Sequence, residues 1–169
     1  MTLKAYTAEL LIARAWQHSQ NQDAPVYPWP WADTFPVFRL SIPSHKQQLI
    51  VLDSDSGASL AFGPGFMPAS SPPGSIGKTV ISAHRDSHFR FLQHIGLGES
   101  ITLETSSGER YEYLVTGTRI IDTRQEALSV SSFADELWLV SCYPFNVIAP
   151  TGPLRYVVVA KRATTVETS

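Results

Sequence analysis

The stretch that decides the fold is Leu137-Trp138-Leu139-Val140-Ser141-Cys142, an apolar run that ends in the only cysteine of the chain. Its length and composition predict a buried β-strand. Two similar runs carry reactive side chains at their edges: residues 80–83 lead into His84, and Arg155 stands at the start of another run. The sequence therefore places a thiol, an imidazole and a guanidinium at strand ends, from where they can converge on one opening.

Further short runs with β character fill the chain from Val37 onward. Strands are predicted at residues 38–42, 49–52, 79–83, 101–103, 111–121, 137–141 and 156–160. Gly, Pro and Ser between them favour a barrel or sandwich over a parallel α/β sheet. The connection 63–77 is expected to cover one end of the barrel. The connections 123–136 and 143–154 are also long, and long ordered loops are often functional.

The N-terminal part differs in composition. Apolar residues three or four apart predict an amphipathic helix over residues 3–18. The predicted apolar stripe consists of Leu3, Tyr6, Leu10, Ala13 and Trp16, widened by Leu11 and Ile12. Residues 19–36 contain four prolines, which predict an extended strap rather than a helix or a strand. We expect Trp29 and Trp31 to pin this strap to the domain.

Composition limits the class of protein. The chain has 169 residues, 43% hydrophobic and 17% charged, which is typical of one globular domain. Its net charge of −2 gives no basic footprint for nucleic acid, and a single cysteine excludes an internal disulfide. No apolar run approaches the ~18 residues of a membrane span, so we expect a soluble chain without a native membrane anchor. The expected division is helix and strap (1–36), β-barrel (37–162) and polar tail (163–169).

The three strand-end residues suit nucleophilic catalysis. A thiolate attacks carbonyls, an imidazole exchanges the necessary protons, and an arginine fork stabilises a developing oxyanion. Cys142, His84 and Arg155 have these side chains, although a free cysteine is also common as a small buried hydrophobe. A metal site at His84 and His88 is the other reading, but the strand before His84 argues against the helical spacing that it needs. We expect no metal.

The sequence resembles the sortase family. The family's nucleophile motif Thr-Leu-x-Thr-Cys stands here as Trp138-Leu139-Val140-Ser141-Cys142, and Leu154-Arg155-Tyr156-Val157-Val158 matches the strand of its arginine. The segments closest to the Gram-negative class are Trp29-Pro30-Trp31-Ala32, Leu60-Ala61-Phe62-Gly63-Pro64-Gly65, residues 84–92 and Ser141-Cys142-Tyr143-Pro144-Phe145. The resemblance implies a mainly β protein, a closed eight-stranded barrel with an N-terminal helix and short helices in the connections.

The resemblance also implies an activity. Cys142 would attack a carbonyl in a C-terminal sorting signal of the Leu-Pro-x-Thr-Gly kind on a surface or secreted protein, giving a thioacyl-enzyme. An amine acceptor would then take the acyl group, with His84 exchanging protons and Arg155 holding substrate and oxyanion. The alternatives are a cysteine peptidase on the same barrel that only hydrolyses, and a non-catalytic β-barrel binding module.

Other implied features concern binding and location. Ser141 is a lesser oxyanion candidate, and the expected groove for the signal is lined by Leu128, Val130, Phe133, Val147 and Ile148. No cofactor is implied, because Glu126, Asp135 and Glu136 are too sparse a set for the calcium that some sortases bind. The implied location is the inner membrane, facing the periplasm.

Overall fold

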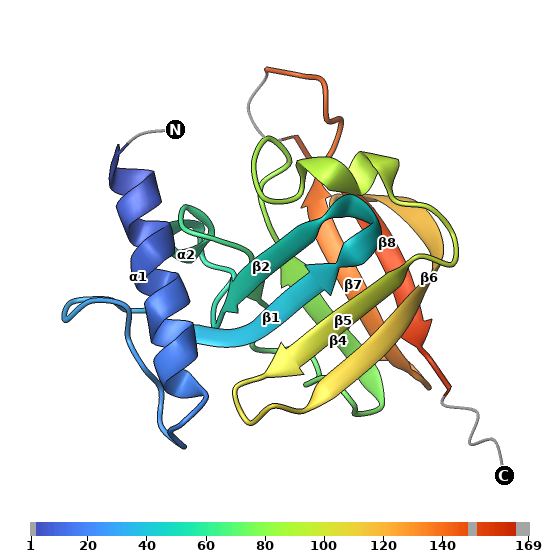
Figure 1. The fold of residues 1–169 in the computed structure, drawn as a ribbon. Coiled ribbons are helices and arrows are strands. Elements are labelled where there is room, and N and C mark those ends of the chain that lie inside the picture. The colour runs from blue at the N-terminus through green and yellow to red at the C-terminus, as the bar shows by residue number, and fades with distance from the viewer. Residues whose placement is uncertain (1–2, 149–151, 165–169) are drawn as a thin grey trace, which may run out of the picture.

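Eight strands close into a barrel, and a single long helix lies outside it against β1 and β2 (Figure 1). The computed structural model describes residues 3–148 and 152–164. The strands are β1 (Pro36–Ile42), β2 (Gln47–Leu52), β3 (Gly65–Phe66), β4 (Gly77–Ser82), β5 (Ser100–Thr105), β6 (Arg110–Asp122), β7 (Asp135–Cys142) and β8 (Leu154–Arg162). The helical elements are α1 (Leu3–Ser19), α2 (Gly57–Leu60), η1 (Pro43–His45) and η2 (Arg90–His94). The predicted fold class is confirmed.

The strand order is β1-β2-β3-β4-β7-β8-β6-β5, and pairing of β1 with β5 closes the barrel. Most neighbours are antiparallel, but β2 with β3 and β4 with β7 are parallel. The β4–β7 pair decides where the site forms. Because both strands run in the same direction, the residues that follow them meet at one edge of the barrel.

Alternation along β7 divides its side chains between two apolar clusters. Leu137 and Leu139 point into the barrel, where they join a core from all the long strands. Trp138 and Val140 point outward and join a second cluster with Val80 of β4. The outer face of β4 and β7 is therefore apolar as well, so it needs a cover.

The connection over residues 63–77 is more than the end cover that the sequence predicted. It contains β3, where Gly65 pairs with Leu52 of β2 and Phe66 pairs with Ile81 of β4. A Cβ on Gly65 would lie 2.1 Å from the backbone oxygen of Ser54, so only glycine fits there. A strand of two residues has no alternation to read, and only its long-range pairing defines it.

The helix α1 was predicted correctly, but its buried face was predicted only in part. The chain buries Ala8, Ile12, Ala15, Trp16 and Ser19, whereas Leu3, Tyr6 and Leu10 are exposed. The helix thus has apolar residues on two sides. Of the predicted stripe, Ile12 and Trp16 are buried and Leu11 is half-buried, whereas Leu3, Tyr6, Leu10 and Ala13 are exposed.

The strap after α1 is held by fewer contacts than expected. Trp29 packs edge-to-face on Phe62, with ring centroids 5.2 Å apart, as predicted for a pinning residue. The same prediction for Trp31 is wrong, because its side chain is 83% exposed. Instead, the buried hydroxyl of Thr34 donates a hydrogen bond of 2.6 Å to Asp53 at the end of β2.

A polar contact fixes the start of β7. The fully buried Tyr113 of β6 donates its hydroxyl proton to Asp135 at 2.9 Å, and the same oxygen accepts from the amide of Gly74 at 3.3 Å. Burial raises the pKa of Asp135, while the Tyr113 hydroxyl and the positive charge of Arg162 oppose that rise. The contact therefore holds β6, β7 and residue 74 together at the end of the barrel opposite Cys142.

Candidate active site

The pairing of three strands brings His84, Cys142 and Arg155 into one row. Ser82 of β4 pairs with Val140 of β7, and the amide of Ala83 donates to the Val140 carbonyl at 3.1 Å. His84 lies two residues after Ser82, and Cys142 lies two residues after Val140. The two residues therefore lie side by side where β4 and β7 end. On the other side, Cys142 pairs directly with Arg155 of β8.

The three side chains share the outer face of the sheet. Cys142 lies two residues after the outward-facing Val140, and directly opposed residues of antiparallel strands point to the same side. Cys142 is a free, half-buried thiol, and His84 is exposed. The structure thus brings together the three residues that the sequence singled out: Cys142 pairs with Arg155 along the strands and lines one cleft with His84.

The guanidinium of Arg155 is held by backbone oxygens. Its Nη1 donates to the carbonyls of Gly152 at 2.7 Å and Leu154 at 3.0 Å. Within residues 3–148 and 152–164, no hydrogen bond is seen from Nε or Nη2. Two anchored bonds fix the plane of the fork, and its remaining N–H groups are available to an oxygen near Cys142.

Cys142 and His84 line a cleft of about 620 Å³. Its other walls come from the segment after β4, from η2 and from the segment after β7: Arg85, Asp86, Arg90, Gln93, Phe145, Asn146, Val147 and Ile148. The predicted groove residues Val147 and Ile148 are among them. Arg155 borders Cys142 from β8 but does not line this cleft. A cleft of this size is suited to a short peptide segment.

Two features hold the loops around the cleft. Arg85 Nη2 donates to the carbonyl of Val147 at 3.0 Å, which joins the segment after β4 to the segment after β7. Behind them, Tyr143 stacks on Tyr156 at 6.1 Å, and Phe145 meets Tyr156 edge-on at 5.2 Å. The aromatic group fixes the first residues after Cys142 on the barrel.

Apolar side chains form a strip on the outer face of the sheet. Its buried members are Val80, Ile121, Trp138, Val140 and Val157. Two of the predicted groove residues, Leu128 and Val130 from the connection between β6 and β7, pack on this strip. Lys78 ties this connection down, because its amide donates to the Val130 carbonyl at 3.1 Å. The connection between β6 and β7 is therefore what covers the apolar outer face of β4 and β7.

Neither Ser141 nor Phe133 faces the cleft or packs on the apolar strip. Ser141 lies on the opposite face of β7 from Cys142, is 2% exposed, and its Oγ has no hydrogen-bond partner in the described part of the chain. Strand alternation keeps its hydroxyl away from the cleft. Phe133 projects fully into solvent and is not packed against the strip.

Several cleft residues were missed from the sequence. Arg85 and Asp86 adjoin His84 in the chain, so their closeness was a usable signal. Arg90 and Gln93 return to the cleft only because η2 turns the chain back, and no local pattern shows this. Trp138 was noted only as a departure from a motif, yet it closes the far end of the apolar strip.

The carboxylates considered for calcium have other partners. Asp135 accepts from Tyr113, Glu126 pairs with Arg119 at 3.2 Å, and Glu136 accepts from the indole of Trp138 at 3.0 Å. Among the residues that the structure describes, no group of three or more His, Cys, Asp or Glu is placed to hold a metal ion.

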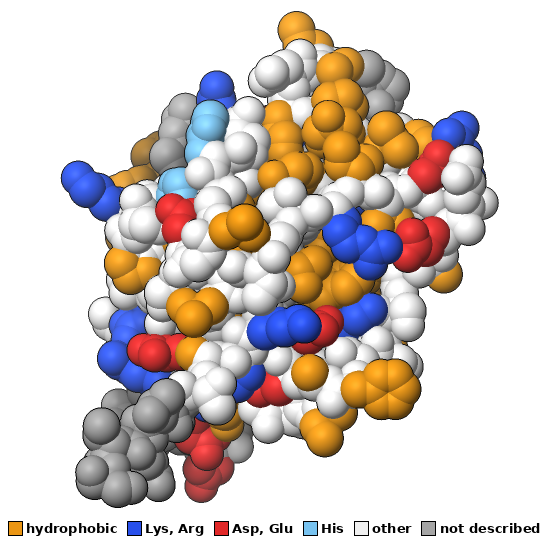
Figure 2. Space-filling view, turned by 90° about the vertical axis from the view of Figure 1, so that its right-hand side faces the viewer, with side chains coloured by type: hydrophobic (Ala, Val, Ile, Leu, Met, Phe, Trp, Pro, Cys, Tyr) orange, Lys and Arg blue, Asp and Glu red, His pale blue; other side chains and the backbone are white. Residues whose placement is uncertain are grey.

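The surface around β6 to β8 carries charged side chains of both signs. Figure 2 shows basic and acidic side chains interspersed with hydrophobic ones on this face. Among the described residues, no helix has the length and apolar character that crossing a membrane requires.

Comparisons with a family model and with a relative point to the same family. A family model described as "Sortase domain" matches residues 40–163. Sortase D of Bacillus subtilis (strain 168) is 31% identical over 126 residues, which is 74% of this chain and 63% of that protein. The match thus spans less than two thirds of the relative's length.

Solved structures share the fold at low identity. A sortase D5 transpeptidase from Clostridium perfringens has a TM-score of 0.68 at 14% identity, covering 94% of this chain and 99% of that one. Sortase A from Corynebacterium diphtheriae has a TM-score of 0.66 at 20% identity, covering 96% and 86%. Both matches extend over α1 and the strap as well as the barrel.

Proposed function

This chain belongs to the sortase family, and from that premise we propose that it is a cysteine transpeptidase with Cys142 as its nucleophile. The observation that supports the proposal is that Cys142 pairs with Arg155 along the strands and lines one cleft with His84. A thiol with a base and an oxyanion donor beside it, at the edge of a peptide-sized cleft, is suited to acyl transfer.

The reaction proceeds in two steps. The sulfur of Cys142 attacks a backbone carbonyl, the C–N bond breaks, and His84 gives a proton to the leaving amine. An incoming amine then attacks the thioester, loses a proton to His84 and releases the Cys142 thiolate. The free N–H groups of Arg155 stabilise the oxyanion in both steps.

The acyl substrate is a surface or secreted protein with a C-terminal sorting signal of the Leu-Pro-x-Thr-Gly kind. In support, Leu128 and Val130 are half-buried on the same face as Cys142, so their outer sides offer an apolar surface beside the thiol. Apolar residues of the signal, on the acyl side of the broken bond, pack there. Val147 and Ile148 border the other side of the thiol.

A peptide assay tests the proposal. A peptide ending in such a signal is incubated with the protein and a simple amine, and products are read by mass spectrometry. We expect a ligated product that disappears in Cys142→Ala, which should keep the wild-type melting temperature because losing one sulfur at a cleft edge leaves little cavity. Hydrolysis alone at saturating amine would identify a peptidase, and no cleavage of the signal peptide would favour a non-catalytic β-barrel binding module.

We also propose that the protein acts at the inner membrane, facing the periplasm. The support is the resemblance of residues 84–92 and of the segment after Cys142 to the Gram-negative class. Fractionation of a Gram-negative cell that produces the protein from its native gene tests this. Recovery in the cytosolic fraction would contradict it.

A further inference from the structure

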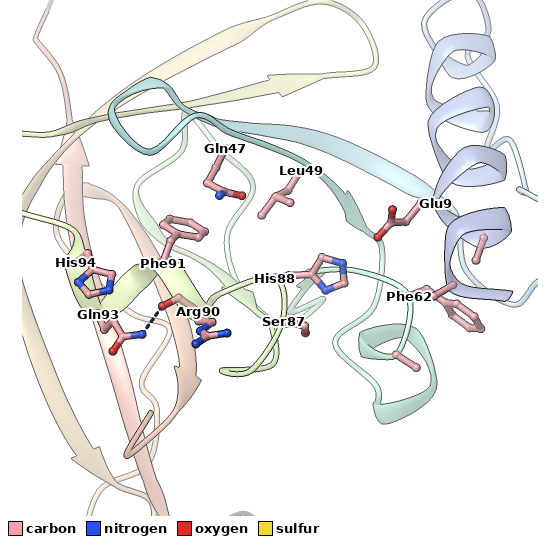
Figure 3. Close-up of a pocket in the computed structure, with 13 residues that line it drawn as sticks. Glu9, Gln47, Leu49, Phe62, Ser87, His88, Arg90, Phe91, Gln93 and His94 are labelled. Carbon is pink, nitrogen blue, oxygen red and sulfur yellow. Dashed lines mark hydrogen bonds between the residues drawn. The ribbon is translucent and has the colours of Figure 1, made fainter. Parts of the chain in front are cut away.

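A second cavity, of about 690 Å³, lies between α1 and the barrel (Figure 3). Its walls come from α1, β2, the residues after α2, and residues 87–94. Arg90 and Gln93 line this cavity and also the cleft at Cys142, so the two adjoin on the side of His84. We call it the α1 pocket.

The chemistry of the α1 pocket changes along its length. Arg90 and Gln93 lie at the end shared with the cleft, and Leu49 and Phe91 form apolar walls farther in (Figure 3). At the α1 end, the carboxylate of Glu9 lies opposite the imidazole of His88. The pocket thus offers N–H donors, then an apolar wall, then a negative charge.

Two polar groups at the α1 end lack partners. Within the described part of the chain, Nδ1 of His88 is buried without a hydrogen-bond partner. The side chain of Glu9 is exposed to solvent, forms no hydrogen bond or ion pair there, and acts on His88 through its charge. Burial lowers the pKa of His88, the charge of His84 lowers it further, and Glu9 opposes both. His88 is therefore mainly neutral at pH 7, and the negative charge of Glu9 is not cancelled. A buried donor or acceptor without a partner is rare in proteins and points to a functional role of its site.

We propose that the α1 pocket binds the amine acceptor, an inference that rests on the proposed function. The acceptor is a peptide with a free amino terminus, an apolar second residue and a basic third residue. The amine must reach the thioester from the side of His84, which takes its proton, and the pocket opens on that side. The first carbonyl accepts from Arg90 or Gln93, the apolar side chain packs on Leu49 and Phe91, and the basic group pairs with Glu9.

The bonding changes balance without a further reactant. The peptide's nitrogen forms a bond to the thioester carbon, the C–S bond breaks, and the sulfur leaves as the thiolate of Cys142. The proton lost by the nitrogen passes to His84 and from there to the thiolate. The products are an amide and the free enzyme.

Glu9 gives this pocket a character that the barrel alone lacks. The family match begins at residue 40, whereas α1 ends at Ser19. Glu9, Ala5 and Ala8 all come from α1, and the buried Ile12 and Trp16 hold that helix on the barrel. Acceptor recognition would thus be a property of the N-terminal helix, separate from recognition of the acyl substrate.

The test compares two acceptors, Gly-Leu-Lys-amide and Gly-Leu-Glu-amide, in the transpeptidation assay. We expect the KM of the lysine peptide to be lower by about fivefold, as one partly exposed ion pair allows. Glu9→Gln should remove this preference and leave hydrolysis without amine unchanged. Glu112→Gln, the same change at an exposed site on β6, is the matched control and should keep it.

Each outcome separates the pocket from the proposed function. Equal KM values for the two peptides in the wild type, or a preference that survives in Glu9→Gln, would overturn the α1 pocket while acylation of Cys142 proceeds normally. Absence of any acylated Cys142 would overturn the proposed function, and the acceptor role with it. Calorimetry with Cys142→Ala supplies a readout without chemistry, in which the lysine peptide should bind more tightly than the glutamate peptide.

Discussion

Tyr113→Phe tests whether the polar contact at the start of β7 stabilises the barrel. The change removes one hydroxyl from a fully buried ring, and with it the bond donated to Asp135 and the one accepted from Gly74. A hydrogen bond to a charged group contributes about 1.5–3 kcal/mol, and an orphaned amide adds to the loss. We expect the free energy of unfolding to fall by about 2–3 kcal/mol, measured by urea denaturation at pH 7.

Tyr111→Phe is the matched control. Tyr111 lies two residues away on the same strand, and its hydroxyl donates to Glu109 at an exposed position. Loss of an exposed hydrogen bond should cost no more than about 0.5 kcal/mol. Similar losses for the two variants would refute the reasoning, because burial of the hydroxyl would then have no energetic consequence.

The pH dependence gives a second check on the same variant. Burial raises the pKa of Asp135 in the folded state, and donation by Tyr113 opposes this, so the variant should raise that pKa further. A raised carboxyl pKa means that the folded state binds a proton more readily than the unfolded state, so stability falls as pH rises. The loss caused by Tyr113→Phe should therefore be smaller at pH 4 than at pH 7. A larger loss at pH 4 would contradict the assigned direction.

Three other changes have definite expected results. Trp16→Ala removes the largest buried side chain of α1, so we expect the free energy of unfolding to fall by about 3 kcal/mol and residues 3–35 to be cleaved faster by protease; unchanged proteolysis would show that other residues hold α1. The amide of Gly96 and then the imidazole of His45 lower the pKa of Glu99. Glu99→Gln should therefore lower the melting temperature at pH 7, and this effect should shrink as the pH falls and the carboxylate of the folded wild type becomes protonated; an effect that grows as the pH falls would contradict this. Arg155→Lys should reduce turnover by about a hundredfold at unchanged stability, because an ammonium lacks the anchored fork, and near-normal kcat would make the arginine structural.

The barrel was predictable because its longer strands are short apolar or β-branched runs separated by Gly, Pro and Ser. In β7 the run from Leu137 to Val140 is apolar on both faces of the strand and stops at Cys142. The positions of His84 and Arg155 at the ends of similar runs were equally visible. Their convergence followed only from the pairing of β4, β7 and β8, which a sequence does not show.

Other features depend on contacts between distant segments. The two-residue strand β3 exists because Gly65 and Phe66 bridge β2 and β4, so it has no local pattern. The buried face of α1 is set by what the barrel offers it, and two apolar sides made the periodicity ambiguous. The α1 pocket joins residues 5–9, 47–49, 61–62 and 87–94, which no spacing in the sequence connects.

Ser141 illustrates how a motif can mislead about a side chain. Its position next to the nucleophile suggested a hydroxyl near the oxyanion, but adjacent residues of a strand face opposite ways. Its Oγ lies inside the barrel instead. Val140, two residues before the thiol, shares the face of the site and is the better neighbour to examine.

The most direct measurement is the intact mass of the protein after brief incubation with a sorting-signal peptide in the absence of an added amine. If Cys142 is the nucleophile, the protein gains the mass of the peptide's N-terminal part, the adduct maps to Cys142, and hydroxylamine removes it. Cleavage of the peptide by a Cys142→Ala variant, or an adduct on any other residue, would contradict the assignment.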